Sequence, residues 1–263
     1  MRVCRVRVGE DISYAAIDGL SDDLEITDDS VVAFIDGYPF GEWTPRGTVA
    51  RAREVTLLAP VIPSKVIGIG KNYRDHAAEM GGEVPADPLM FLKPSTAVIG
   101  PGDAIRLPWQ SEDVHHEGEL ALVIGRLCRD VPAERAAEVI FGFTCANDVS
   151  ARDLQRTDGQ WTRAKGFDTF CPLGPWIETE FDWTDARLTC AVNGEVRQDS
   201  NVGDVVVGVP DLIAAVSAVM TLVPGDVILT GTPAGVGPIR GGDTVTVRIE
   251  GLGSLTNPVV DGG

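Results

Sequence analysis

Short extended segments separated by glycine and proline dominate this sequence, and they limit its fold more than any other feature. The chain carries 30 glycines and 17 prolines among 263 residues, and both residue types mark turns and interrupt regular structure. The one long helical pattern covers only 209–222. Most other apolar stretches have the length of strands, about four to eight residues. The pattern therefore predicts an α+β protein that is mostly β.

The expected elements follow this pattern along the chain. Strands are predicted at 2–8, 31–35, 55–58, 65–70, 89–92, 119–124, 141–147, 227–230 and 243–250, short helices at 72–80 and 132–139, and a loop at 42–46. The clearest signal is a hairpin in which 188–192 and 195–198 flank Asn193-Gly194, a dipeptide that favours a tight two-residue turn. Pro60 and Pro63 then divide the chain, so we expect a small domain at 1–60 and a larger one at 61–263.

The charge balance excludes several classes of partner. The chain has 22 basic and 39 acidic residues and a net charge of −17, which argues against binding nucleic acid or an anionic membrane surface. No run of 18 apolar residues and no signal-peptide pattern occurs in the sequence, so no transmembrane helix is expected. Five cysteines without a CxxC pair indicate reduced thiols and a cytoplasmic protein. We therefore expect a small-molecule or protein partner.

An acidic motif before a strongly apolar segment is the first candidate for chemistry. It reads His115-His116-Glu117-Gly118-Glu119. If a strand begins near His116, both glutamates point to the same face, where they repel one another unless a cation lies between them. Oxygen ligands favour Mg²⁺ or Mn²⁺, whereas zinc held by both histidines is less favoured because adjacent strand residues point in opposite directions. The alternative is that both glutamates face water.

Two further motifs place ionisable residues where a site could form. Asp148 follows the apolar segment 141–145, as a third metal ligand or as the N-cap of a short helix. Arg152 and Gln155 lie on the turn after it. His76 and Glu79 are three residues apart, so on a helical turn Glu79 would orient the histidine as a base. A surface helix with an incidental ion pair is the alternative.

Three loops could supply contacts to an anionic ligand. The glycine-rich turn at 68–70 allows backbone amides to approach such a ligand. Lys165 lies beside Gly166 and would neutralise an oxyanion, or it is simply a solvated lysine. The segment 230–232 follows a strand and offers hydroxyls and amides to a carboxylate, although an ordinary tight turn also explains it.

Taken together, these segments resemble the fumarylacetoacetate hydrolase family. The resemblance is to its shorter members, the fumarylacetoacetate-hydrolase-domain-containing proteins. The resemblance covers about Ile62 to Val260. Its motifs are Gly-Lys-Asn-Tyr-Arg-Asp-His-Ala-Ala-Glu (70–79), Phe-Leu-Lys-Pro-Ser (91–95), His-His-Glu-Gly-Glu-Leu (115–120), Asn-Asp-Val-Ser-Ala-Arg-Asp-Leu-Gln (147–155), Lys-Gly-Phe-Asp-Thr (165–169), Pro-Gly-Asp (224–226) and Thr-Gly-Thr-Pro-Ala-Gly-Val-Gly (230–237). Each motif is weak alone, but their common order and spacing are specific.

The resemblance implies a mixed β-roll at 61–263 as the catalytic domain, usually in a homodimer. It implies Mg²⁺ or Mn²⁺ bound by three carboxylates, and a catalytic dyad on a mobile lid with a catalytic lysine beside it. The implied metal ligands are Glu117, Glu119 and Asp148, the implied catalytic residues are His76, Glu79 and Lys165, and the implied substrate contacts are Gly70, Arg152, Gln155 and Thr232.

The resemblance also implies a small anionic 2-oxo or 2-hydroxy acid as substrate, converted through a metal-stabilised enolate. Among family members, the sequence is most similar to bacterial enzymes of aromatic catabolism. These isomerise 2-hydroxyhepta-2,4-diene-1,7-dioate or decarboxylate 5-oxopent-3-ene-1,2,5-tricarboxylate. The alternatives are a hydrolase of fumarylpyruvate or another acylpyruvate, an oxaloacetate decarboxylase, and a catalytically silent ligand-binding relative. A dianionic substrate on an acidic protein requires a locally positive pocket.

Overall fold

The computed structural model describes residues 1–262 and confirms a mostly β protein of the α+β class. Its largest sheet has 12 strands in the order β4-β3-β2-β1-β14-β12-β11-β17-β6-β7, with β5 on β1 and β8 on β14. These strands are β1 (Arg2–Val8), β2 (Asp11–Asp18), β3 (Val31–Gly37), β4 (Trp43–Arg51), β5 (Thr56–Leu58), β6 (Val66–Gly70), β7 (Leu89–Lys93), β8 (Val98–Ile99), β11 (Gly118–Ile124), β12 (Ile140–Asn147), β14 (Cys171–Glu178) and β17 (Val227–Leu229).

Two smaller sheets and short helices complete the fold. A five-stranded sheet contains β9 (Ile105–Leu107), β15 (Arg187–Val192), β16 (Glu195–Asn201), β19 (Thr244–Ile249) and β20 (Gly253–Asp261), and a three-stranded sheet contains β10 (Val114–His116), β13 (Ser150–Ala151) and β18 (Gly237–Pro238). The α-helices are α1 (Arg74–Glu79), α2 (Arg152–Asp158), α3 (Thr162–Gly166) and α4 (Val209–Val219), and the 3₁₀ helices are η1 (Ala52–Glu54), η2 (Ser95–Ala97), η3 (Ala133–Glu138) and η4 (Val202–Asp204).

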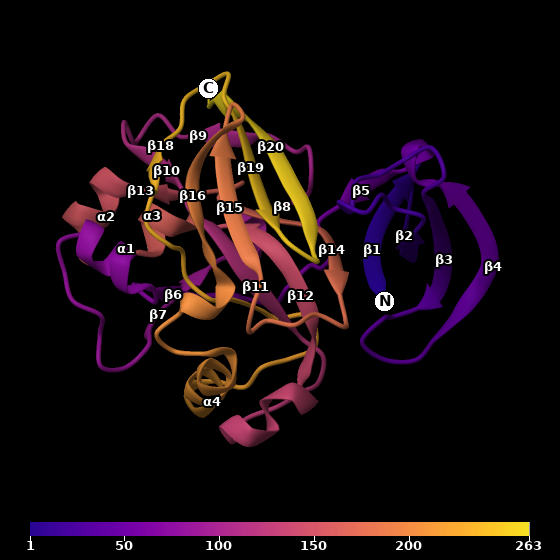
Figure 1. Ribbon diagram of the computed structural model, residues 1–263, viewed down its shortest axis with the longest axis horizontal. Helices are drawn as coiled ribbons and strands as arrows, with labels where there is room; N and C mark the ends of the chain where they lie inside the picture. Colours follow the sequence, from indigo (N-terminus) through magenta and orange to yellow (C-terminus); the bar gives the residue numbers. More distant parts are fainter. Residues whose placement is uncertain (263) are drawn as a thin grey trace.

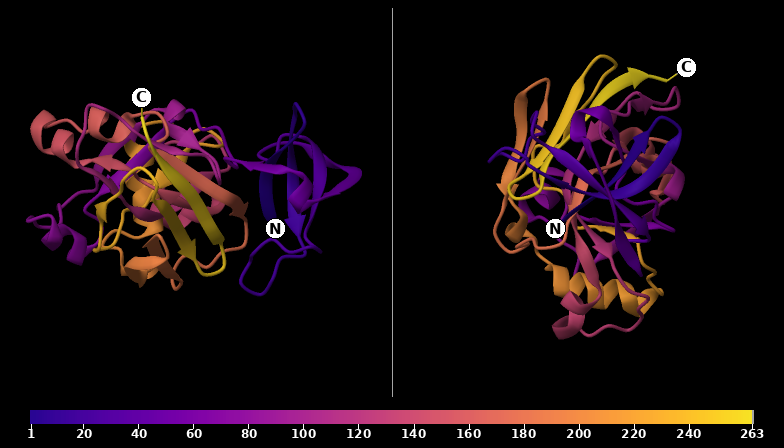
Figure 2. Two further views of the ribbon diagram at one scale, coloured as in Figure 1. Left: turned by 90° about the horizontal axis from the view of Figure 1, so that it is seen from above. Right: turned by 90° about the vertical axis from the view of Figure 1, so that its right-hand side faces the viewer.

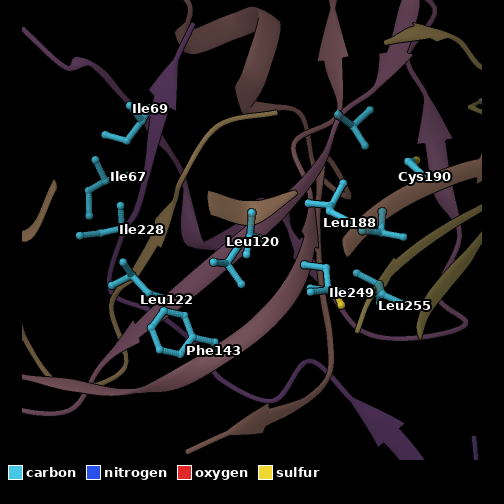
Figure 3. Close-up of a cluster of buried hydrophobic side chains, with 14 of the residues drawn as sticks. Ile67, Ile69, Leu120, Leu122, Phe143, Leu188, Cys190, Ile228, Ile249 and Leu255 are labelled. Carbon is cyan, nitrogen blue, oxygen red and sulfur yellow. The ribbon is translucent and has the colours of Figure 1, made fainter. Parts of the chain in front are cut away.

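The main core lies between the large sheet and the five-stranded sheet. Figure 3 shows Leu120, Leu122 and Phe143 of the large sheet on one side, and Leu188 and Ile249 of the other sheet across from them. All of these side chains are buried, and the removal of such apolar surface from water is the main force that holds two sheets together. This sandwich fixes β11 and β12, the two strands that lead into the acidic motifs.

The first five strands form a separate lobe, which Figures 1 and 2 show beside the rest of the molecule. Strand β1 pairs with β14, where Val3 faces Ile177, so the large sheet continues from one lobe into the other. Phe40 adds an aromatic contact, since its ring lies 4.4 Å from that of Phe141. The proposed domain boundary at residues 60 and 61 stays a prediction.

The predicted elements agree with the structure in most places and differ in a few. The hairpin is confirmed, and its turn residues Asn193 and Gly194 have φ angles of 53° and 81°, as a type I′ turn requires. The loop expected at 42–46 is wrong from Trp43 onward, because β4 begins at that residue. That strand is exposed over most of its length and pairs with β3, so its polar sequence gave no apolar alternation. The helix expected at 132–139 is the 3₁₀ helix η3.

The long helical pattern is confirmed as α4, although the helix ends at Val219. Within residues 1–262, no helix combines the length and the apolar character that a membrane crossing requires. The five cysteines carry free thiols.

Candidate active site

Three buried carboxylates lie close together where β11 begins and β12 ends. Glu117, Glu119 and Asp148 each offer an oxygen within 4.8 Å of the others, and their exposed fractions are 3%, 2% and 1%. Strand pairing explains this arrangement, since Gly118 faces Asn147 across the antiparallel ladder. Glu117 and Asp148 therefore lie side by side just beyond the paired residues, and Asp148 N donates to Glu117 O at 2.8 Å. The interpretation that these acids face water is wrong.

The local path of the chain differs from the expected one. A continuous strand does not run through the motif, because β10 ends at His116 and β11 begins at Gly118 in another sheet. Glu117 occupies the break, where its N–H donates to Asn147 Oδ1 at 2.9 Å. His115 contacts Asp113, whereas His116 contacts Gln198, so the two histidines have separate partners.

Three cationic side chains surround the carboxylates. Lys165 Nζ donates to Glu117 Oε2 at 2.7 Å and to Asp148 Oδ2 at 2.5 Å. Arg152 Nη2 contacts the other oxygen of Glu117, and Lys93 Nζ donates to Asp148 Oδ1 at 2.5 Å. All three cations are buried, and they compensate the charge of the carboxylates locally. Lys165 is therefore a buried site residue, and the solvated-lysine interpretation is wrong.

The pKa shifts follow from this distribution of charge. Burial raises the pKa of Glu117, but the charges of Arg152 and Lys165 outweigh burial and hold that pKa well below its usual range. Burial, together with the charges of Asp148 and Glu117, raises the pKa of Glu119 well above its usual value. Burial lowers the pKa of Lys165, yet the charges of Asp148 and Glu117 reverse this effect and raise it. Of the three close carboxylates, Glu119 is therefore the one whose charged form is disfavoured.

The loop after β17 holds Glu119 and adds a hydroxyl to the site. Gly231 N donates to Glu119 Oε2 at 2.7 Å, and Thr232 Oγ1 donates to Gly118 O at 2.9 Å. Gly231 adopts a φ of +101°, and a side chain there would lie 2.7 Å from Asn72 Cβ, so the close approach of the loop requires glycine.

Helix α1 carries the predicted pair of His76 and Glu79. His76 is 5% exposed, and its Nδ1 lies 3.2 Å from Glu79 Oε2. The other oxygen of Glu79 accepts from Gly235 N at 3.1 Å. His76 also faces the cavity described below. An incidental pair on the protein surface does not account for this buried histidine.

A cavity of about 190 Å³ brings the predicted site residues together. Its lining includes Gly70, His76, Glu117, Glu119, Asp148, Arg152, Gln155, Lys165 and Thr232. Among the residues that the structure describes, Glu79 is not part of this lining, but it contacts His76, which is. Helix α2 begins at Arg152 with Ala151 as its N-cap, so the prediction that Asp148 caps this helix is wrong. On α2, Arg152 Nη1 donates to Gln155 Oε1 at 2.7 Å.

The sequence interpretation missed several residues of this site. Lys93 belongs to the motif 91–95, but the sequence alone assigns it no role; its place between an apolar segment and Pro94 is the one local signal. The cavity is also lined by Ile69, Lys71, Met80, Phe91, Arg156 and Trp161. The Phe91 ring lies 4.8 Å from Lys165 Nζ, within the range of a cation–π contact.

The glycines of β6 also have a packing reason, in addition to the expected approach of a ligand to their backbone, which stays a prediction. A side chain at Gly68 would lie 2.1 Å from the Phe91 ring, and one at Gly70 would lie 2.6 Å from Trp161. These glycines therefore make room for two aromatic side chains of the cavity wall.

The motif Pro224-Gly-Asp lies away from the cavity, and its buried Asp226 accepts a hydrogen bond from Ser64 Oγ at 2.6 Å. Its role is therefore structural.

Comparisons with known proteins agree with this fold. A family model described as fumarylacetoacetate (FAA) hydrolase C-terminal matches residues 65–260, and one described as Rv2993c-like, N-terminal, matches residues 1–60. Fold, acidic triad and cavity thus define an enzyme with the catalytic domain of fumarylacetoacetate hydrolases. The chain belongs to the fumarylacetoacetate hydrolase family.

Three similar proteins illustrate the range of the family. The 2-hydroxyhepta-2,4-diene-1,7-dioate isomerase from Mycobacterium marinum is 50% identical, with a TM-score of 0.92 over 100% of this chain and 99% of that chain. The human mitochondrial oxaloacetate tautomerase FAHD2B is 48% identical over 79% of this chain and 70% of its own length. A maleylpyruvate hydrolase from Sphingobium sp. SYK-6, in complex with manganese(II) and pyruvate, is 32% identical, with a TM-score of 0.80 over 100% of both chains.

Proposed function

We propose that this protein is a divalent-metal-dependent enzyme that moves a proton on the enol or enolate of a small 2-oxo dicarboxylic acid. The favoured substrate type is 2-hydroxyhepta-2,4-diene-1,7-dioate, with isomerisation or decarboxylation of its precursor as the reaction. The observation that carries the proposal is the buried acidic triad beside a buried histidine in one cavity.

The charges of the site support a divalent cation and a dianionic substrate. Three carboxylates are matched by the three cations Arg152, Lys165 and Lys93, so the site is close to neutral without an ion. A divalent cation would add two positive charges, which a dianion then neutralises within a buried volume where unbalanced charge is costly. This local balance is compatible with the acidic surface of the protein.

The donor set fits Mg²⁺ or Mn²⁺, held by Glu117, Glu119 and Asp148. All three ligands offer oxygen, the donor that hard divalent cations prefer. Burial, together with repulsion from Asp148 and Glu117, raises the pKa of Glu119, and a cation among the three carboxylates would relieve this repulsion. When bound, such an ion acts as a Lewis acid that stabilises an enolate.

The remaining residues are assigned by their positions. His76 faces the cavity and is oriented by Glu79, so it would accept or donate the proton at the substrate carbon. Lys165 places its ammonium between two carboxylates at the cavity wall, where it would stabilise developing negative charge. Arg152, Gln155, Thr232 and the backbone at Gly70 would bind and orient the carboxylate groups of the substrate.

Two other activities use the same enolate. Oxaloacetate chemistry, as decarboxylation or tautomerisation, is the first, because the human relative is named an oxaloacetate tautomerase. Hydrolysis of an acylpyruvate is the second, because the maleylpyruvate hydrolase shares the fold. The family relationship further supports a homodimer and a cytoplasmic role in aromatic catabolism.

A substrate panel with Mg²⁺ and with Mn²⁺ tests the proposal. It contains the C7 dienedioate, oxaloacetate and acylpyruvates, and it follows enol absorbance and CO₂ release separately. Loss of enol absorbance without CO₂ supports isomerisation or tautomerisation, whereas CO₂ release supports decarboxylation. Cleavage of an acylpyruvate to pyruvate and a second carboxylic acid, without CO₂ release, would identify a hydrolase instead. Tight binding of a 2-oxo acid without turnover would establish a silent ligand-binding relative and refute the enzyme proposal.

A further inference from the structure

Gln198 on β16 is a buried amide whose two ends bind different parts of the active-site framework. Its exposed fraction is 0%. Its Oε1 accepts from Gly118 N at 2.9 Å and lies 3.2 Å from His116 Nδ1. Its Nε2 donates to Thr232 Oγ1 at 2.7 Å and to Pro233 O at 2.8 Å. Both ends of the amide are thus satisfied, which fixes its orientation.

The partners on the oxygen side enclose a proposed metal ligand. His116 and Gly118 are the residues immediately before and after Glu117, at the break between β10 and β11. The backbone N–H of Glu117 is therefore bound by Asn147, and both of its neighbours in the chain contact Gln198. Because β10 and β11 belong to different sheets, a link at this break limits the position of the carboxylate between them.

The partners on the nitrogen side belong to the loop that reaches the cavity. Thr232 lines the cavity, and its hydroxyl accepts from Gln198 while it donates to Gly118 O at 2.9 Å. The same loop contacts β16 again at Gly235, where an added Cβ would lie 2.0 Å from Arg197 O. Strand β16 thus supports the loop at two successive residues, Arg197 and Gln198.

This loop also holds two proposed site residues through its backbone. Gly231 N donates to Glu119 at 2.7 Å, and Gly235 N donates to Glu79 at 3.1 Å. A change in the contact between the loop and β16 would therefore move the partners of a metal ligand and of the residue that orients His76. Strand β16 of the hairpin therefore affects the position of these site residues, although it is not part of the acidic motifs.

We propose that Gln198 is a positioning residue that holds Glu117 in metal-binding geometry and fixes the Thr232 loop against β11. The inference rests on the proposed metal site. Among residues 1–262, those that line the cavity do not include Gln198, so it acts through its neighbours. Partners that orient metal ligands in this way typically change metal affinity or activity by about 10- to 100-fold when they are replaced.

Two variants at this position separate the two ends of the amide. Gln198→Met keeps the length of the side chain but removes every hydrogen bond, and we expect Mn²⁺ affinity to fall about 10- to 100-fold. Gln198→Glu keeps an acceptor for Gly118 and removes the donor to Thr232. We expect this variant to raise KM for the substrate more than it weakens Mn²⁺ binding, with a smaller change in kcat.

Asn257 on β20 provides a matched control. It is 1% exposed, and its Nδ2 donates to Gly100 O at 2.8 Å and to Asp103 O at 2.9 Å, contacts that involve other residues than the cavity lining. Asn257→Leu should lower the melting temperature but leave Mn²⁺ affinity unchanged. Mn²⁺ is titrated into the intact protein without substrate, with free Mn²⁺ measured by electron paramagnetic resonance and folding by circular dichroism.

The parent protein is titrated first, because its failure to bind Mn²⁺ would refute the proposed metal site itself. If the parent binds Mn²⁺, parent-like affinity and KM in both Gln198 variants would overturn only the positioning role. A Gln198→Met variant that loses as much melting temperature as Asn257→Leu but retains the Mn²⁺ affinity of the parent would also overturn it. If Gln198→Met does not fold, the KM and Mn²⁺ affinity of Gln198→Glu decide: the expected change supports the proposal, and parent values overturn it.

Discussion

Replacement of Lys93 by methionine should destabilise the metal-free protein in a way that a divalent cation partly repairs. Lys93 is fully buried, and its ammonium donates to Asp148 Oδ1 at 2.5 Å and to Val149 O at 3.2 Å. Methionine has a similar length but carries no charge, so Lys93→Met leaves one oxygen of a buried carboxylate without its cation. A cation bound at the triad would return positive charge to the same place.

The size of the loss follows from the remaining contacts of Asp148. Loss of one partner from a buried ion pair lowers the free energy of unfolding by about 3–5 kcal/mol. Lys165 still donates to the other oxygen of Asp148 at 2.5 Å, so we expect the lower end, about 3 kcal/mol. At about 2–4 °C per kcal/mol for a chain near this size, the melting temperature should fall by roughly 6–12 °C.

The assay compares melting temperatures in EDTA and in saturating Mg²⁺. The decrease caused by Lys93→Met should be largest in EDTA and smaller in Mg²⁺, because an ion that binds only the folded protein stabilises it and meets less positive charge in the variant. Lys65→Met is the matched control, since Lys65 contacts the buried Asp226 outside the cavity. Its decrease should be the same in EDTA and in Mg²⁺.

Two results would refute this reasoning. A decrease for Lys93→Met that is equal in EDTA and Mg²⁺ would mean that the ion does not replace the lysine charge. If Mg²⁺ also reduced the loss of melting temperature in Lys65→Met, and by as much as in Lys93→Met, the recovery would be a general effect of the salt.

Three further variants test the site and its packing. Glu119→Ala should abolish metal binding and activity together, and calorimetry that finds undiminished Mg²⁺ affinity would contradict the metal assignment. His76→Ala should spare metal affinity but lower kcat by about 10²- to 10⁴-fold, as loss of a general base does; a rate within a few-fold of the parent would remove His76 from the mechanism. Gly68→Ala should lower the free energy of unfolding by about 1–3 kcal/mol, as overpacking does, because its Cβ would lie 2.1 Å from the Phe91 ring. Urea denaturation measures this loss, and a parent-like midpoint would contradict it.

Local patterns in the sequence predicted much of the secondary structure. The turn at Asn193-Gly194 and the apolar segment that forms β11 were correct because each depends on neighbours within a few residues. The exposed strand β4 and the break at Glu117 were missed. In both cases pairing with another strand, rather than the local sequence, determines the backbone.

The sequence by itself determined which residue types this protein has available for chemistry: paired glutamates, an aspartate after an apolar segment, and a histidine three residues before a glutamate. Tertiary structure decided their state. The register of β11 against β12 brings Asp148 beside Glu117, and Lys93 reaches Asp148 from β7, 55 residues away in the sequence. Burial and the position of opposite charges depend on such long-range pairing, so only the folded chain could show that these acids form one compensated, buried site.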